Sequence, residues 1–206
     1  MGNYRCSAKS VSAFIQQLAV GYVTHGYWFY VTGRVPEGKD PKAVDEKLIK
    51  KYGLNISRTA RSRRKQAGIA SVQYLRHNRF FVLIATKGAH PFFEEEPFKD
   101  IRHHRLKYGG YSVSYKAGHA CVRIEREQYK CLKSYFEELA TSRRRETLEK
   151  AFSELPFSAY APVRRQLLDM VSAVNKKRKE AGYEPLSWSC LRLTRRNVRV
   201  FEEGEA

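Results

Sequence analysis

The sequence ASVQYLRHNRFFVLIAT at residues 70–86 decides the fold class of this chain. It predicts two strands, residues 70–76 and 79–86, which are joined by a tight turn at His77 and Asn78. The second strand is apolar on both faces, which is typical of a strand in the middle of a sheet. The stretch therefore predicts a β-hairpin at the centre of an antiparallel sheet.

Further strands and helices are expected on both sides of this hairpin. Short segments rich in aromatic or β-branched residues predict three more strands, at residues 27–31, 111–116 and 120–124. Apolar side chains at helical spacing and capping residues predict six helices, at residues 10–23, 41–52, 57–67, 126–144, 145–155 and 161–181. Residues 87–108, which contain two prolines and an acidic cluster, are expected to form a long loop.

The order of these elements predicts an α+β protein. We expect a mostly antiparallel sheet of four or five strands, in the layout of ferredoxin-like and RNA-recognition folds, with helices on one face and a C-terminal helical hairpin. Residues 1–125 are expected to form a basic α+β core that binds nucleic acid. Residues 126–206 are expected to form a helical region that packs on this core and ends in a short strand or hairpin.

The distribution of charge indicates a polyanionic partner. The chain carries 39 Lys and Arg against 21 Asp and Glu, a formal net charge of +18. Residues 47–93 contain eleven Lys and Arg and no Asp or Glu, and residues 101–124 contain five more with three histidines. Because a surface of one charge sign repels itself and destabilises the compact state, DNA or RNA is the expected partner. Protein partners in a nucleoprotein complex, including one of a mobile element, fit the same charge.

Composition also bounds the location of the protein. No stretch approaches the length of apolar sequence that crosses a membrane, and the N-terminus lacks the layout of a secretion signal. The four cysteines contain no closely spaced pair of the kind that binds zinc. We therefore expect a cytoplasmic protein with reduced thiols and no membrane partner.

The helix expected at residues 57–67 gives the strongest local signal for nucleic-acid binding. It places five cations within eight residues, which form a broad positive surface suited to phosphate contacts, with an ordinary solvated surface as the alternative. Four of the five are arginines, whose planar guanidinium fits phosphate better than lysine does. Two tyrosines on the expected strands are candidates for stacking on unpaired bases. The expected nucleic-acid-binding residues are Arg58, Arg61, Arg63, Arg64, Lys65, Tyr74, Arg76, Arg79, Arg102, Arg105, Lys107 and Tyr111.

A catalytic alternative rests on two tyrosines. Tyr129 and Tyr135 lie on the helix that follows the last strand of the sheet. This position resembles that of the nucleophile in rolling-circle replication initiators and single-strand transposases. The resemblance implies a single-strand endonuclease with a tyrosine nucleophile. However, the metal-binding histidine pair of those enzymes has no counterpart on the expected central strand, residues 80–86. The same strand also lacks the glycine of an RNA-recognition signature.

A second catalytic alternative is a metal-dependent nuclease. The acidic cluster Glu94–Glu96, together with Asp100, would then hold Mg²⁺. Otherwise this cluster is expected to fold onto the basic surface of the protein. His103 and His104 are adjacent, a spacing that suits phosphate contacts better than a shared metal ion. We expect no metal and no cofactor, with Mg²⁺ required only if the nuclease alternative holds. A third alternative is a ribonucleoprotein subunit whose basic surface is buried against structured RNA.

Overall fold

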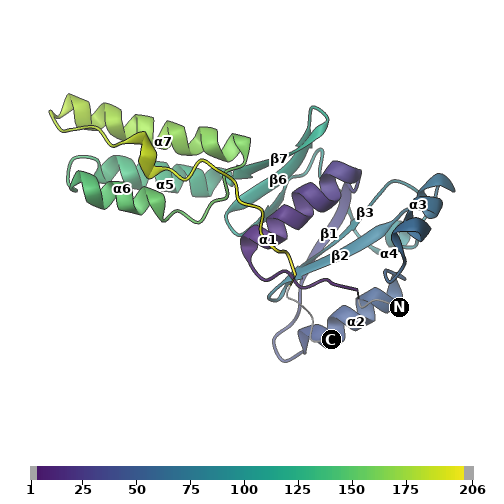
Figure 1. Ribbon diagram of the computed structural model, residues 1–206. Helices are drawn as coiled ribbons and strands as arrows, with labels where there is room; N and C mark the ends of the chain where they lie inside the picture. Colours follow the sequence, from purple (N-terminus) through teal and green to yellow (C-terminus); the bar gives the residue numbers. More distant parts are fainter. Residues whose placement is uncertain (1–3, 202–206) are drawn as a thin grey trace. The chain divides into compact units, whose positions relative to one another are not determined.

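The structure, a computed structural model, describes residues 4–201, apart from the side chain of Arg58 (Figure 1). Within these residues it contains seven α-helices and two antiparallel sheets, of four and three strands. The expected α+β class and the antiparallel central sheet are therefore confirmed. The chain divides into two compact units. The first comprises the residues up to Leu106, Val113–Cys121 and the segment from Val198, and the second comprises Lys107–Ser112 and Val122–Asn197. The expected domain boundary after residue 125 stays a prediction.

The central sheet of the first unit is built around the predicted hairpin. Its strands, in spatial order, are β2 (Val72–His77), β3 (Phe80–Ala85), β1 (Phe29–Arg34) and β4 (Lys99–Asp100). Asn78 makes the turn between β2 and β3 with a φ of 53°, which Asn tolerates better than most residues. Tyr74 and Val31 both pair with Leu83, so these three side chains form a row on one face of the sheet.

Helices cover both faces of this sheet. On one face, α2 (Pro41–Lys51) and α4 (Phe92–Glu95) pack against the row that contains Tyr74 and Leu83. On the other face lies α1 (Val11–Gln16), whose Phe14 contacts Phe80 edge-on, with 5.7 Å between ring centroids (Figure 1). The sequence predicted helices on one face only. The structure differs because every residue of β2 is buried, which requires cover on both sides.

The segment expected to be a long loop is structured, and it leads into a second sheet. It contains α4 and β4, and it ends in β5 (Leu106–Tyr108). β5 pairs with the hairpin of β6 (Tyr111–Lys116) and β7 (His119–Ile124), in the order β5-β6-β7. The two C-terminal strands expected in the central sheet therefore belong to a separate three-stranded sheet.

The second unit contains the three helices expected at residues 126–144, 145–155 and 161–181. They are α5 (Arg126–Leu139), α6 (Arg145–Ser153) and α7 (Ala161–Glu180). Phe136 of α5 stacks on Phe152 of α6 with 3.9 Å between ring centroids, and Figure 1 shows α5 and α7 side by side. The burial of these apolar helix faces against one another forms the core of the second unit.

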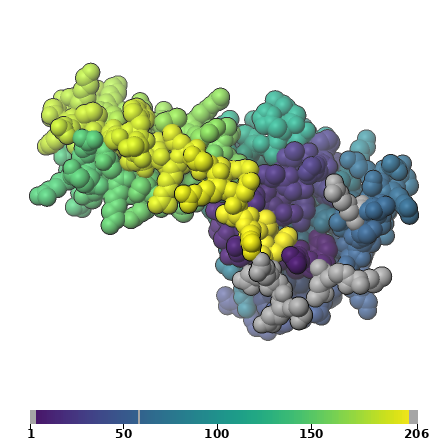
Figure 2. All heavy atoms as spheres, in the orientation of Figure 1, coloured from purple at the N-terminus to yellow at the C-terminus, as the bar shows by residue number. Residues whose placement is uncertain are grey.

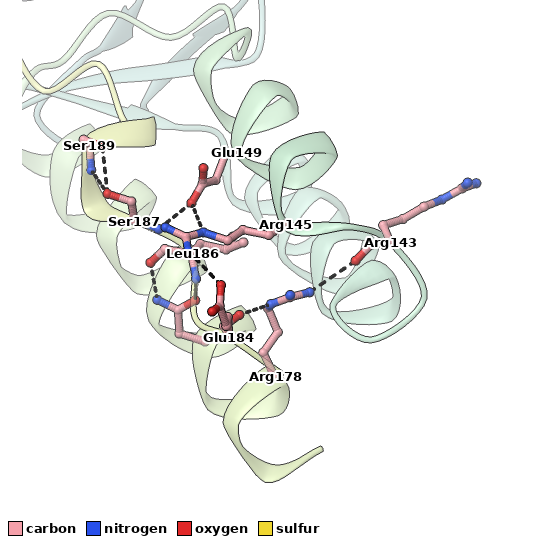
Figure 3. A network of polar contacts seen from close by, with 9 residues as sticks. Arg143, Arg145, Glu149, Arg178, Glu184, Leu186, Ser187 and Ser189 are labelled. Atoms are coloured by element: carbon pink, nitrogen blue, oxygen red, sulfur yellow. Dashed lines mark hydrogen bonds and ion pairs between the residues drawn. The ribbon is translucent and has the colours of Figure 1, made fainter. Parts of the chain in front are cut away.

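A buried arginine fixes the chain after α7 (Figure 3). The Arg178 guanidinium donates to the carbonyl oxygens of Ala140, Arg143 and Glu184 at 2.6–3.2 Å. Because its partners are backbone carbonyls, Arg178 closes the end of the helical unit and is not available to a ligand.

The C-terminal segment differs from the strand expected at its end. A short 3₁₀ turn at Trp188–Cys190 is followed by extended chain, and the only strand-like pairing in the described part of this segment is a single bridge between Ala8 and Phe201. The side chain of Gln16 both donates to and accepts from the backbone of Val198, at 2.9 and 3.0 Å. This side chain satisfies backbone groups that a neighbouring strand would otherwise pair.

Candidate nucleic-acid interface

The basic helix predicted from the sequence is present as α3 (Arg58–Gln66). It begins at Ser57, whose hydroxyl accepts from the backbone N–H of Ala60 at 3.1 Å, and it ends before Gly68, which has a positive φ of 72°. Its last turn carries Arg63, Arg64 and Lys65. Cations at this end interact favourably with the partial negative charge of the helix C-terminus. The helix is therefore compatible with its high positive charge.

Four cations of α3 have no carboxylate partner within the described residues. No ion pair involves Arg61, Arg63, Arg64 or Lys65 within the described part of the chain. Arg63 and Lys65 are exposed, and α3 lies at the surface of the face shown in Figure 2, in blue. Arg61 is half-buried and donates to the carbonyl of Ile56 at 2.8 Å, so part of its role is structural. The side chain of Arg58 lies outside the described residues.

A second basic element is the turn at residues 101–105. It is held firmly, because the N–H of Ile101 donates to the carbonyl of Trp28 at 2.8 Å and the Tyr30 hydroxyl donates to the carbonyl of His104 at 3.0 Å. His103, His104 and Arg105 are exposed on this turn. Their side chains therefore project from a rigid backbone toward solvent.

Two of the cations predicted near this turn have carboxylate partners. Arg102 forms a two-pronged pair with Asp100, with nitrogen–oxygen distances of 2.6–3.0 Å. Burial opposes ionisation of Asp100, but the hydrogen bonds from Arg102 outweigh it, and the pKa of Asp100 lies below its ordinary value. Lys107 pairs with Glu125 at 2.5 Å while remaining exposed. Both cations are thus partly neutralised.

Two predicted phosphate ligands in the hairpin have structural roles instead. Arg76 is buried and forms a two-pronged ion pair with Asp45, with its nitrogens 2.7–3.0 Å from the carboxylate oxygens. Arg79 donates to the carbonyl of Pro36 at 2.6 Å, and more weakly to those of Val35 and Lys39. The structure therefore removes Arg76 from the candidate phosphate ligands, and Arg79 offers only part of its guanidinium.

The two predicted stacking residues are both buried. Tyr74 lies in the core of the first unit and donates to Asp45 at 2.6 Å. Tyr111 lies in the second unit, where its hydroxyl donates to the carbonyl of Pro156 and accepts from the N–H of Ser158. Their ring faces cannot reach a base. Alternation along a strand told which residues share a face, but not that both faces would be covered.

A different set of aromatic residues lies at the β4 edge of the central sheet. We define the aromatic edge as Trp28, Phe29, Phe93, Phe98 and Tyr115, together with Arg102. Phe98 is 41% exposed. This set was not among the residues expected to bind, because its members come from four separate segments of the chain. The sequence signal was that Trp28 and Phe29 belong to the strand expected at residues 27–31, and Tyr115 to the strand expected at residues 111–116.

The two tyrosines of the catalytic alternative lie in different environments on α5. The Tyr129 hydroxyl donates to Asp169 of α7, which also pairs with Lys133 at 2.7 Å. Burial, and then Asp169, raise the pKa of Tyr129 well above its ordinary value. Tyr135 is 54% exposed. No group of three or more His, Cys, Asp or Glu able to hold a metal ion occurs within residues 4–201.

The acidic cluster contacts a basic helix of its own unit. Glu95 pairs with Lys51 of α2 at 2.9 Å, and Glu96 accepts from the Tyr52 hydroxyl at 2.6 Å. These carboxylates thus face α2, and no ion pair within residues 4–201 joins them to the described cations of α3. The cluster was expected to fold onto the basic surface of the protein. Of these two contacts, only the one with Lys51 agrees with that expectation.

None of the described helices is both long and apolar enough to cross a membrane.

Comparison with known proteins adds no further assignment. No protein-family model and no curated protein matches the sequence.

Proposed function

We propose that this protein binds nucleic acid through its phosphates, with α3 as the principal contact. The observation that carries the proposal is the set of cations on α3 that have no carboxylate partner in the described part of the chain. Such a group repels itself unless an anion binds it. A polymer with regularly spaced phosphates is the anion that matches several cations along one helix.

The proposed contacts position the protein but do not read sequence. Arg63, Arg64 and Lys65 extend from the last turn of α3, and Arg105 adds one exposed cation on the turn at residues 101–105. Contacts of this kind supply affinity that depends strongly on salt, whereas sequence is read at base edges. We therefore expect binding that depends weakly on sequence and steeply on ionic strength.

The test is the salt dependence of binding, measured by fluorescence anisotropy with a labelled oligonucleotide. We expect the variant R63Q/R64Q/K65Q to lower affinity and to reduce the slope of log K against log [salt] by about 2–3, since each neutralised phosphate contributes about 0.7–0.9. Arg61 is retained because it donates to Ile56, and its removal would confuse binding with stability.

A matched control removes the same charge from the second unit. The variant K130Q/K150Q/K179Q changes three exposed lysines. Two of them form only exposed ion pairs, with Glu127 and Glu154, so little stability is lost. Its salt slope should match that of the unmodified protein. If the α3 variant is folded, by thermal melting, and keeps the original slope, α3 is not the phosphate contact.

The catalytic alternative has one observation in its favour. Tyr129, Lys133 and Asp169 form a compact polar group of a possible nucleophile, a cation and an acceptor. A single-strand endonuclease of this kind would still be a nucleic-acid-binding protein. Detection of a covalent tyrosine adduct would separate the two functions.

A further inference from the structure

We propose that the aromatic edge stacks on unpaired bases, so that the preferred ligand of this protein is single-stranded nucleic acid. This inference rests on the proposed function and names the class of nucleic acid that it selects. The stacking side chains are then those of the aromatic edge, where Phe98 is exposed, and not the buried Tyr74 and Tyr111.

Phe98 presents the most exposed ring of the aromatic edge. It is 41% exposed although it packs edge-on against Phe93 and Phe29, with centroid distances of 5.0 and 5.7 Å. These two neighbours are half-buried and hold the Phe98 ring in place. A fixed ring stacks on a base with a smaller loss of conformational freedom than a mobile one.

Arg102 extends this edge with a second planar surface. Its guanidinium lies over the indole of Trp28, 4.5 Å from the ring centroid, and Trp28 in turn packs against Tyr115 at 5.1 Å. The two-pronged pair with Asp100 fixes the guanidinium in this position. The Arg102 side chain remains 37% exposed. Guanidinium planes stack on unpaired bases as aromatic rings do.

The indole of Trp28 is unusual because its N–H is unsatisfied. Trp28 Nε1 is the one buried side-chain nitrogen or oxygen without a hydrogen-bond partner within residues 4–201. Leaving such a group unpaired costs about 1–3 kcal/mol. Phenylalanine at this position would avoid that penalty but would present a smaller ring beneath Arg102. The indole therefore supplies a larger supporting surface for the guanidinium plane.

Exposed cations occur in the same segments as these rings. Lys99 of β4 follows Phe98 in the sequence, Arg105 lies on the turn after Arg102, and Lys116 follows Tyr115, and all three cations are exposed. A surface that combines cations with ring faces is typical of proteins that hold single strands. In a duplex the faces of the bases are stacked on each other and cannot reach such rings. The edge therefore fits a single strand better than a duplex.

The experiment combines one variant with three ligands. F98L/R102K removes the exposed ring and the guanidinium plane but keeps an apolar side chain and the charge. Binding is measured to a single strand, to its duplex, and to a strand of equal length with abasic positions. For the single strand we expect a loss of affinity of at least about fivefold, because base stacking contributes roughly 1–3 kcal/mol per base. Affinity for the abasic strand should not change.

A matched control changes the same residue types in the second unit. W188L/R144K replaces an exposed aromatic residue and an exposed arginine, and it should leave binding to all three ligands unchanged. Should F98L/R102K fail to fold, W28F replaces it. That variant removes the unsatisfied N–H, so we expect equal or higher thermal stability together with weaker binding to the single strand.

The outcomes distinguish this inference from the proposed function. If F98L/R102K weakens binding to the single strand and to the abasic strand equally, the edge contacts the backbone and stacking is excluded. If the unmodified protein binds duplex as tightly as single strand, and only the α3 variant loses affinity, the inference fails and the proposed function stands. Absence of binding to every ligand at low salt overturns both.

Discussion

Arg76 and the arginines of α3 belong to the same acid-free stretch of sequence but have opposite environments. Arg76 is buried and is held in a two-pronged ion pair by Asp45. Arg63 and Arg64 have no carboxylate partner in the described part of the chain, and Arg63 is exposed. One arginine stabilises the fold, and the others are available to a ligand.

The difference shows that a stretch without acids in sequence need not lack acids in space. Asp45 lies just before the acid-free stretch, at the buried side of α2, and is 31 residues away from Arg76. The same relation occurs at the second acid-free stretch, residues 101–124, where Lys107 pairs with Glu125, the first residue after the stretch. Cations whose partners come from the borders of a stretch have their charge neutralised within the fold. Cations without such partners are the candidates for binding.

The first prediction concerns the buried ion pair between Asp45 and Arg76, and it has the largest expected effect. Asp45→Ala leaves Arg76 buried without a counter-charge and removes the acceptor of the Tyr74 hydroxyl. We expect a loss of about 3–5 kcal/mol in the free energy of unfolding, measured by urea denaturation. R63Q/R64Q/K65Q should change it by no more than about 0.5 kcal/mol.

Glu46 supplies the control for this measurement. It is the exposed neighbour of Asp45 on α2, so Glu46→Ala changes the charge equally without opening the buried pair. An equal loss of stability in both variants would mean that the loss comes from the changed net charge of α2. The buried ion pair between Asp45 and Arg76 would then not stabilise the fold.

Much of the fold could be predicted from the sequence because its signals are local. Asp40 and Ser57 cap helices as expected, since each cap depends on a few neighbouring residues. The turn at Asn78 and the strands beside it follow from a similarly short pattern. The split into two sheets could not be predicted, because it depends on pairing between β5 and β6 that no local pattern specifies.

The candidate site could be predicted only in part, for the same reason. The cations of α3 follow from their own helix, and the sequence identified them. The burial of Tyr74 depends on helices from distant segments that cover both faces of the sheet. The contact between Trp28 and Arg102 depends on the pairing of β1 with β4, which comes from residues expected to be a loop.

The second prediction concerns Arg79, which is intermediate between the two kinds of arginine. Its guanidinium donates to backbone carbonyls and has no carboxylate partner in the described part of the chain. Arg79→Ala should lower the free energy of unfolding by about 1 kcal/mol, since the hydrogen bonds are partly exposed. Lys87→Ala, which removes an exposed cation from the same stretch, should leave stability unchanged. A larger loss of affinity for nucleic acid in the Arg79 variant than in the Lys87 variant would show that Arg79 contacts the nucleic acid.

The third prediction tests the pair at the border of the second acid-free stretch. Lys107, and then the N–H groups of Gln128 and Glu127, lower the pKa of Glu125 to about 2. A carboxylate with a lowered pKa stabilises the folded state above its unfolded pKa, near 4.5, and this contribution is lost as the pH falls toward 2. Glu125→Gln should therefore reduce the difference in stability between pH 5 and pH 2 by a modest amount, because Lys107 is 63% exposed.

The matched control for that measurement is Glu127→Gln, in the first turn of α5. Glu127 is exposed and its ion pair with Lys130 is longer, at 3.7 Å. Thermal melting across the pH range should show a smaller change for this variant. If both variants behave alike, the capping contact of Glu125 does not stabilise the second unit through its charge.

The last prediction applies the same comparison to the tyrosines of α5, and we expect no effect. Tyr129 is committed to Asp169, as Arg76 is to Asp45, whereas Tyr135 is exposed. The raised pKa of Tyr129 disfavours the phenolate that would attack a phosphodiester. Labelled single-stranded and hairpin DNA, incubated with the protein and Mg²⁺ or Mn²⁺, should therefore give no covalent adduct on a denaturing gel. An adduct that disappears in Tyr129→Phe would make Asp169 the proton acceptor and establish the endonuclease. An adduct lost only in Tyr135→Phe would place the chemistry on the exposed residue, and the distinction between committed and available side chains would then hold for catalysis as well as for binding.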